Sequence, residues 1–125
     1  MDYFCGPLTL YTSDKIRLID FLSNVLEFEV NTEEDLVIGG SLSIKIHELK
    51  IENGKKTDLN SAVAFNFELK NEDELSEIVN KYNFFQYRNH QKNSQTEKLT
   101  VIESSELSIF DLDGREWRFK ARLTH

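Results

Sequence analysis

Hydrophobic and polar residues alternate along several short segments of the chain, and this pattern predicts a protein rich in β-strands. The clearest case is Leu42–Glu48, where Leu42, Ile44 and Ile46 alternate with Ser43, Lys45 and His47. One face of such a strand is buried and the other is polar. Similar or short apolar runs predict strands at Leu8–Thr12, Phe28–Val30, Leu36–Ile38, Val63–Leu69, Phe84–Tyr87, Leu99–Ile102, Leu107–Leu112 and Glu116–Ala121.

Two other segments have apolar residues at the helical period. Ser13 or Asp14 is positioned to cap the first helix, whose apolar positions are Ile16, Ile19, Leu22, Val25 and Leu26. Asn71 is expected to cap the second helix, with Glu74 completing a capping-box pattern. The apolar positions of this second helix are Leu75, Ile78, Val79 and Tyr82.

The two halves of the chain repeat each other. With one constant offset and no gap, Leu8 aligns with Phe65, Leu18 with Leu75 and Phe28 with Phe85. We therefore predict an α+β fold of two βαβββ modules, module one over about 5–52 and module two over about 60–125, in a single domain 1–125. The modules are expected to join into a curved, mostly antiparallel sheet whose helices cover the convex side, leaving a concave cup.

Two dipeptides are predicted to make tight hairpin turns, Gly39-Gly40 and Asp113-Gly114. After the second turn, alternation places Trp117 and Phe119 on the core side of the last strand, as it does Phe65 and Phe67 on theirs. The charged residues Glu116, Arg118 and Lys120 then lie on the opposite face.

Composition narrows the class of protein. The 125 residues are enough for a real core, and 30% charged with 39% hydrophobic residues is ordinary for a soluble domain. A net charge of −7 argues against nonspecific binding to nucleic acid. Cys5 stands alone, which excludes an internal disulfide, and no apolar run is long enough to cross a membrane. The N-terminus lacks the basic segment followed by an apolar run that is expected of a secretory signal, so we expect a cytoplasmic protein.

Several motifs resemble the vicinal oxygen chelate superfamily, which includes glyoxalase I, bleomycin and fosfomycin resistance proteins, and extradiol dioxygenases. The resemblance covers nearly the whole chain and implies a glyoxalase-like fold of paired modules, and commonly a homodimer. It rests on Leu10-Tyr11-Thr12-Ser13-Asp14, Leu18-Ile19-Asp20-Phe21-Leu22, Val25-Leu26-Glu27-Phe28 and the turn Phe110-Asp111-Leu112-Asp113-Gly114.

The resemblance also implies where catalytic members hold a divalent metal. Three of these positions carry Pro7, Ala64 and Arg118 in this chain, and none of the three is a metal ligand. The fourth falls on the strand that bears Lys45 and His47. We therefore expect no metal cofactor, since a divalent cation needs several converging carboxylates or imidazoles.

The polar residues expected to face the cup are the candidate site. Arg118 would hold an anionic ligand, and the remaining candidates are Tyr11, Lys45, His47, Asn66, Glu68 and Glu116. The competing interpretation is that the charged members pair with one another and fill the cup, in pairs such as Arg118–Glu68 or Lys45–Glu116.

Three functions follow from these alternatives. The first is a small-molecule-binding protein of the glyoxalase and bleomycin-resistance type, without the metal and without metal-dependent catalysis. It would act as a cytoplasmic homodimer without nucleic-acid or membrane partners. The second is a metal-dependent lyase, isomerase or dioxygenase with a displaced site around His47 and Glu68. The third is an interaction module that binds no ligand. We favour the first.

Overall fold

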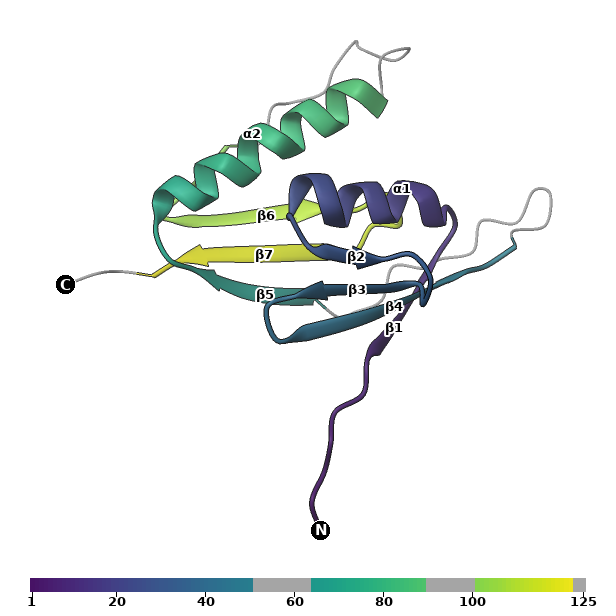
Figure 1. The fold of residues 1–125 in the computed structure, drawn as a ribbon. Helices are drawn as coiled ribbons and strands as arrows, with labels where there is room; N and C mark the ends of the chain where they lie inside the picture. Colours follow the sequence, from purple (N-terminus) through teal and green to yellow (C-terminus); the bar gives the residue numbers. More distant parts are fainter. Residues whose placement is uncertain (51–63, 90–100, 123–125) are drawn as a thin grey trace. The chain divides into compact units, whose positions relative to one another are not determined.

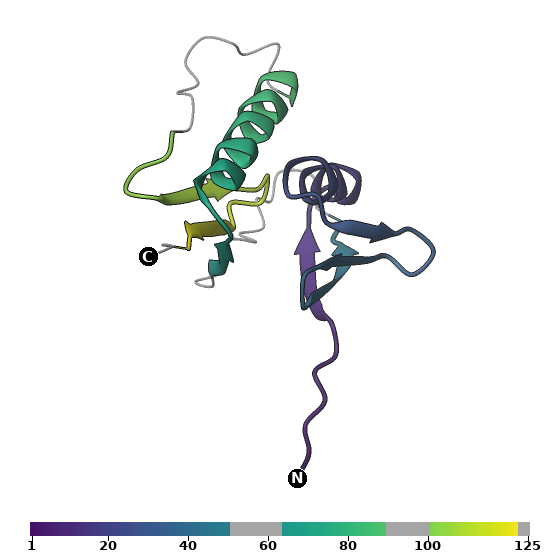
Figure 2. The same cartoon turned by 60° about the vertical axis from the view of Figure 1, so that its left-hand side comes forward.

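A computed structural model describes residues 1–50, 64–89 and 101–122, and the chain divides into two compact units, Met1–Leu59 and Asn60–His125. Each unit combines a sheet with a helix that packs against it (Figures 1 and 2). The α+β class predicted from the hydrophobic pattern is confirmed.

The first unit has the predicted βαβββ order. Its elements are β1 (Leu8–Thr12), α1 (Lys15–Asp20) continued by a π-helical turn (Phe21–Val25), β2 (Glu29–Asn31), β3 (Leu36–Gly39) and β4 (Leu42–Glu48). The sheet order is β1-β4-β3-β2, in which β1 runs parallel to β4 and the other neighbours are antiparallel. The parallel pair requires a crossover, and the helix supplies it.

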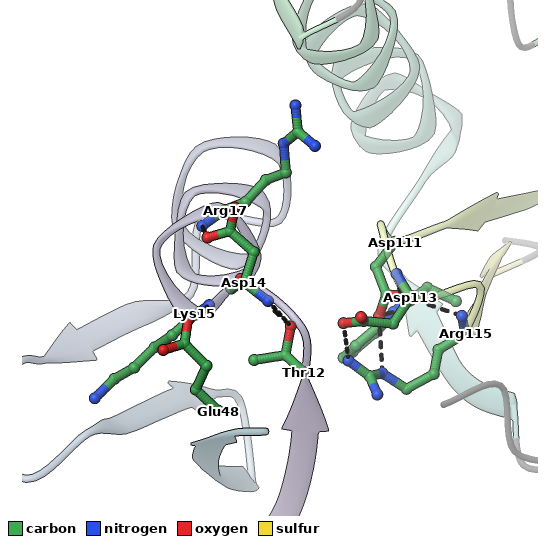
Figure 3. A network of polar contacts seen from close by, with 9 residues as sticks. Thr12, Asp14, Lys15, Arg17, Glu48, Asp111, Asp113 and Arg115 are labelled. Carbon is green, nitrogen blue, oxygen red and sulfur yellow. Dashed lines mark hydrogen bonds and ion pairs between the residues drawn. The ribbon is translucent and has the colours of Figure 1, made fainter. Parts of the chain in front are cut away.

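Three side chains fix the start of α1. Asp14 is the N-cap, and its Oδ1 accepts a hydrogen bond from the Arg17 amide at 3.1 Å. The buried hydroxyl of Thr12 accepts from the Asp14 amide at 3.2 Å, and Glu48 Oε1 accepts from the Lys15 amide at 2.9 Å (Figure 3). Of the two caps left open by the sequence, Asp14 is therefore the one used.

The apolar face of α1 differs from the predicted one. Leu18, Phe21, Leu22 and Val25 are the buried residues of this helix and its π-helical turn, whereas Ile16 is 82% exposed. Ile16 and Leu18 are two residues apart and so point to nearly opposite sides of a helix. The prediction of Ile16 as a core position is wrong because the stripe begins at Leu18.

The hairpin between β3 and β4 is displaced by one residue from the prediction. Gly39 pairs with Leu42, so the two turn residues are Gly40 and Ser41, and Gly40 has a φ of 59°. Gly39 is still required to be small because the ring of Phe28 occupies the space that a Cβ would need.

The second unit contains β5 (Ala64–Leu69), α2 (Glu72–Asn89), β6 (Glu106–Phe110) and β7 (Glu116–Ala121). The sheet order is β5-β7-β6, with β5 parallel and β6 antiparallel to β7. The predicted cap of α2 is confirmed, since Asn71 Oδ1 accepts from the Glu74 amide at 3.1 Å. In both units the first strand thus runs parallel to the last one.

The strand predicted at Phe84–Tyr87 is wrong, because these residues continue α2. No Gly or Pro stops the helix before them, and Phe85 extends the buried stripe of Leu75 and Tyr82. The Tyr82 hydroxyl donates to the carbonyl of Phe110 at 3.0 Å, which ties the helix to the end of β6.

A tight hairpin precedes β6. The amides and carbonyls of Glu103 and Glu106 exchange two hydrogen bonds across Ser104 and Ser105, both of which have positive φ. Of the predicted strand Leu99–Ile102, Val101 and Ile102 are not in a strand, while Leu99 lies outside the described residues. The connection Ile51 to Asn60 also lies outside them.

The loop between β6 and β7 holds a buried network of charges. The side chains of Asp111 and Arg115 are 0% and 5% exposed, and Arg115 Nε donates to Asp111 Oδ2 at 2.9 Å (Figure 3). The same oxygen accepts from the indole N–H of Trp117 at 3.0 Å, and Arg115 Nη2 donates to Asp113 at 2.9 Å. Every buried polar atom of the described side chains has a partner. The predicted hairpin turn at Asp113-Gly114 is confirmed, with Gly114 at a φ of 84°. The network lengthens the connection to the five residues 111–115, so the strand predicted over Leu107–Leu112 ends at Phe110.

We expect Asp111→Asn to lower the free energy of unfolding by about 3 kcal/mol, because it leaves the buried Arg115 short of a carboxylate. Urea denaturation would measure the loss. The matched control is Glu77→Gln, which removes a carboxylate from the exposed pair with Lys81 and should cost less than about 0.5 kcal/mol. Equal effects of the two substitutions would contradict the structural role assigned to Asp111.

Candidate functional site

The pleat of the second sheet separates its side chains into an aromatic face and a polar face. Phe65 stacks on Trp117 with ring centroids 4.4 Å apart, and Phe67 stacks on Phe119 at 5.5 Å. Trp117 and Phe119 are buried, as predicted. The polar face carries the residues that alternate with these aromatics.

Strand register arranges the polar face in rows across the three strands. Asn66 of β5 lies beside Arg118 of β7, which lies beside Ser108 of β6. The next row is Glu68, Lys120 and Glu106. A pocket of about 620 Å³ opens on this face, and its lining consists of Asn66, Phe67, Glu68, Glu106, Leu107, Ser108, Glu116, Arg118, Phe119 and Lys120.

An ion pair lies along β7 in this pocket. Arg118 Nη2 contacts Glu116 Oε1 at 2.8 Å, and the other carboxylate oxygen of Glu116 accepts from the Ser108 hydroxyl at 2.5 Å. The hydrogen bond from Arg118, and after it that from Ser108, lowers the pKa of Glu116. Glu116 in turn raises the pKa of Arg118. Both groups are therefore charged at neutral pH, and Glu116 holds the guanidinium in the pocket.

The remaining polar groups of the pocket are held loosely. Glu106 is 4.0 Å from the ammonium of Lys120, and Glu68 is 3.6 Å from Arg122 Nε, with all four side chains more than half exposed. The side-chain amide of Asn66 makes no hydrogen bond to another residue of the part of the chain that the structure describes. These groups remain available to a ligand.

The other predicted site residues lie on the polar face of the first sheet. Tyr11 and His47 are neighbours in the parallel register of β1 and β4, and their rings meet edge to face with centroids 5.6 Å apart. Lys45 is exposed one row away, beside Thr9. The seven predicted residues therefore form two groups, three in the first unit and four in the second.

Sequence reasoning missed Ser108 and Glu106 as pocket residues. Both alternate with buried Leu107 and Ile109 on β6, so their polar face was readable. The sequence did not reveal which residues of β7 lie opposite them, because the register depends on the length of the loop between the strands.

The positions at which the resemblance places metal ligands do not fit a divalent cation. Pro7 has no donor atom, Ala64 lies beside Glu116 on β5, and Arg118 is a cation already paired with Glu116. Among residues 1–50, 64–89 and 101–122, no three His, Cys, Asp or Glu side chains converge to hold a metal ion. The residues at these positions therefore disagree with the metal centre that the resemblance implies.

Solved structures identify the fold. Fosfomycin resistance protein FosX from Listeria monocytogenes aligns with a TM-score of 0.63 at 14% identity, covering 100% of this chain and 95% of that one. A virulence protein from Salmonella typhimurium gives 0.61 at 19% identity over 98% and 99%, and a hypothetical protein from S. aureus gives 0.63 at 14% over 95% and 97%. The chain has the vicinal oxygen chelate fold. The fold predicted from the sequence resemblance is thus confirmed.

Sequence comparison adds no closer relative, since no protein-family model and no curated protein matches the chain. The similar FosX structures include complexes with Mn(II) and sulfate, and with Mn(II) and dihydroxypropylphosphonic acid. At such identities the likeness is one of fold. In the described residues of this protein, no helix is long and apolar enough to span a membrane.

We expect the Glu116 carboxyl to titrate below its ordinary pKa of 4.5 in a carbon-detected NMR pH titration. Arg118→Gln should move that midpoint upward, because the main group that favours the ionised carboxylate is gone. Lys120→Gln serves as the control, since Lys120 lines the same pocket without contributing to the shift. An unchanged midpoint in Arg118→Gln would refute the ion pair.

Proposed function

We propose that this protein binds a small organic anion on the polar face of its second sheet without a divalent metal. In this proposal the protein is related in function to the resistance and sequestration proteins of the vicinal oxygen chelate superfamily rather than to its enzymes. The observation that carries the proposal is Arg118, a guanidinium inside the pocket at a position where the superfamily would place a carboxylate ligand.

The chemistry of Arg118 suits this role. A guanidinium offers five N–H donors in one plane, and its contact with Glu116 involves Nη2, which leaves other donors for a carboxylate, phosphate or phosphonate. In this proposal the fixed positive charge of Arg118 attracts the ligand anion, as the divalent metal does in metal-containing members of the superfamily. It also repels a divalent cation from the same position.

Two neighbours extend the anion site. Asn66 lies beside Arg118 across the sheet, and its amide can donate to a second ligand oxygen. Lys120 follows two residues after Arg118 on the same face and adds a second cation. A pocket of about 620 Å³ is in the range that drug-sized ligands occupy.

The first alternative is a metal-dependent enzyme with a displaced site around His47 and Glu68. His47 contacts Tyr11 rather than a carboxylate in the described part of the chain. Binding of Mn²⁺ to the purified protein separates the two functions. The second alternative, an interaction module without ligand, predicts no binding of any anion.

Arg118→Gln should weaken binding of methylphosphonate at least tenfold in an isothermal titration run with a chelator present, because the charge-assisted contacts are lost. Arg88→Gln removes an arginine outside the pocket and should leave the affinity unchanged. In the absence of chelator, Mn²⁺ should neither bind stoichiometrically to the purified protein nor raise its melting temperature. Metal binding near one ion per chain, or anion binding that needs Mn²⁺, would overturn the metal-free proposal.

We also propose a cytoplasmic homodimer, as the resemblance to the superfamily implies. Edge strands support the dimer, since among the described residues β1, β2, β5 and β6 each pair on one side only. Sedimentation velocity should then give twice the chain mass of 14.6 kDa at micromolar concentration. A monomer at the highest soluble concentration would exclude the dimer. With a net charge of −7, no retention on immobilised DNA is expected.

A further inference from the structure

The segment that precedes β1 carries large apolar side chains in water. All seven residues of this arm, Met1–Pro7, are exposed, and the side chains of Tyr3 and Phe4 belong to residues that are 86% and 93% exposed. Figures 1 and 2 show the arm leading away from the first sheet. Each aromatic side chain can bury roughly 150–250 Å² in a contact. Docking of the arm on another surface would therefore remove a large apolar area from water.

Helix α2 carries a second exposed aromatic surface. In the first half of the helix its solvent-facing stripe is polar, as at Asp73 and Asn80. In the second half the stripe continues with Phe84 and Tyr87, which are each 64% exposed. The exposed Arg88 follows directly, and the spacing of three and four residues places it on the same face as both rings. We call Phe84, Tyr87 and Arg88 the α2 patch.

The arm and the α2 patch are complementary in composition and charge. The arm has one carboxylate, Asp2, beside its two aromatic residues, and the patch has one guanidinium, Arg88, beside its own two. Aromatic rings attract each other in edge-to-face and offset-stacked pairs. A carboxylate and a guanidinium form a charge-assisted pair, for which Asp2 and Arg88 supply the two groups.

We propose that the arm of one chain docks on the α2 patch of a second copy, so that two copies exchange arms. The inference rests on the homodimer proposed above and is independent of the anion site. Each copy brings one arm and one patch, and a reciprocal exchange covers both surfaces in equal number and closes the assembly. An extended segment of seven residues spans about 23 Å, at about 3.3 Å per residue, which lets the arm reach beyond its own sheet.

The test measures the dimer dissociation constant of the 125-residue chain by sedimentation velocity over a concentration series. The arm variant Tyr3→Ser/Phe4→Ser and the patch variant Phe84→Gln/Tyr87→Gln should each raise this constant at least a hundredfold, because either one removes both exchanged contacts. The matched control is Ile16→Gln, which removes an apolar side chain of α1 that is 82% exposed and should leave the constant unchanged. All five replaced side chains are exposed, so the variants should keep the circular dichroism spectrum of the parent.

Mixing the two variants distinguishes exchange between copies from docking within one chain. A pair of one arm variant and one patch variant has one intact arm and one intact patch, on different chains. An equimolar mixture should therefore dimerise at least tenfold more tightly than either variant alone. If the arm docks on α2 of its own chain, mixing restores nothing, because neither variant has both surfaces.

The outcomes separate arm exchange from the homodimer itself. A parent chain that stays monomeric overturns both. A parent dimer whose two variants dimerise as tightly as the parent overturns arm exchange and leaves the homodimer standing on another surface. An effect in the arm variant alone, or a mixture no tighter than the variants, also overturns the exchange, since the arm then binds elsewhere.

Discussion

The buried carboxylate of Asp111 is the constraint on which the second sheet depends. It accepts hydrogen bonds from Arg115 and Trp117 and from the amides of Asp113 and Arg115, which closes the loop between β6 and β7 in one conformation. A buried ion pair is favourable only when its hydrogen bonds are complete, and among the described side chains they are. The loop length fixed in this way decides which residues face each other across the hairpin.

Register connects this loop to the pocket. In the observed hairpin Ser108 faces Arg118 and Phe110 faces Glu116. A two-residue turn at Asp113-Gly114 would shift the pairing by one residue and place Ser108 opposite Phe119. Because side chains alternate along a strand, that shift would put a polar residue of β6 beside a core residue of β7. The contacts among Ser108, Glu116 and Arg118 thus follow from a buried network that does not itself line the pocket.

The same example explains how far sequence reasoning could go. Alternation correctly predicted that Trp117 and Phe119 are buried and that Arg118 is not, because burial parity needs only the strand itself. The hairpin at Asp113-Gly114 is confirmed, but the strand predicted to reach Leu112 ends at Phe110, because the alternation contains no information on a buried Asp111–Arg115 pair. Likewise Phe84–Tyr87 reads equally well as a strand or as one more helical turn, and the burial of Phe85 in line with Leu75 and Tyr82 favours the helix.

The internal repeat shows which positions the fold keeps apolar in both units. Aligned positions of the two halves that face the core remain apolar, as Leu18 with Leu75 and Val25 with Tyr82. On the polar faces the parallel strand pairs also correspond, so that Thr9 and Lys45 match Asn66 and Arg118.

The next row of each polar face differs in charge. Tyr11 and His47 form an aromatic contact in the first unit, whereas their counterparts Glu68 and Lys120 are of opposite charge. Both units carry a cation on the last strand, Lys45 in the first and Arg118 in the second. Among the described positions of these rows, carboxylates are found in the second unit, where Glu68 and Glu106 lie beside Lys120. The charges of this row in the second unit are therefore not a consequence of the fold, because the same fold carries an aromatic pair at the corresponding positions of the first unit.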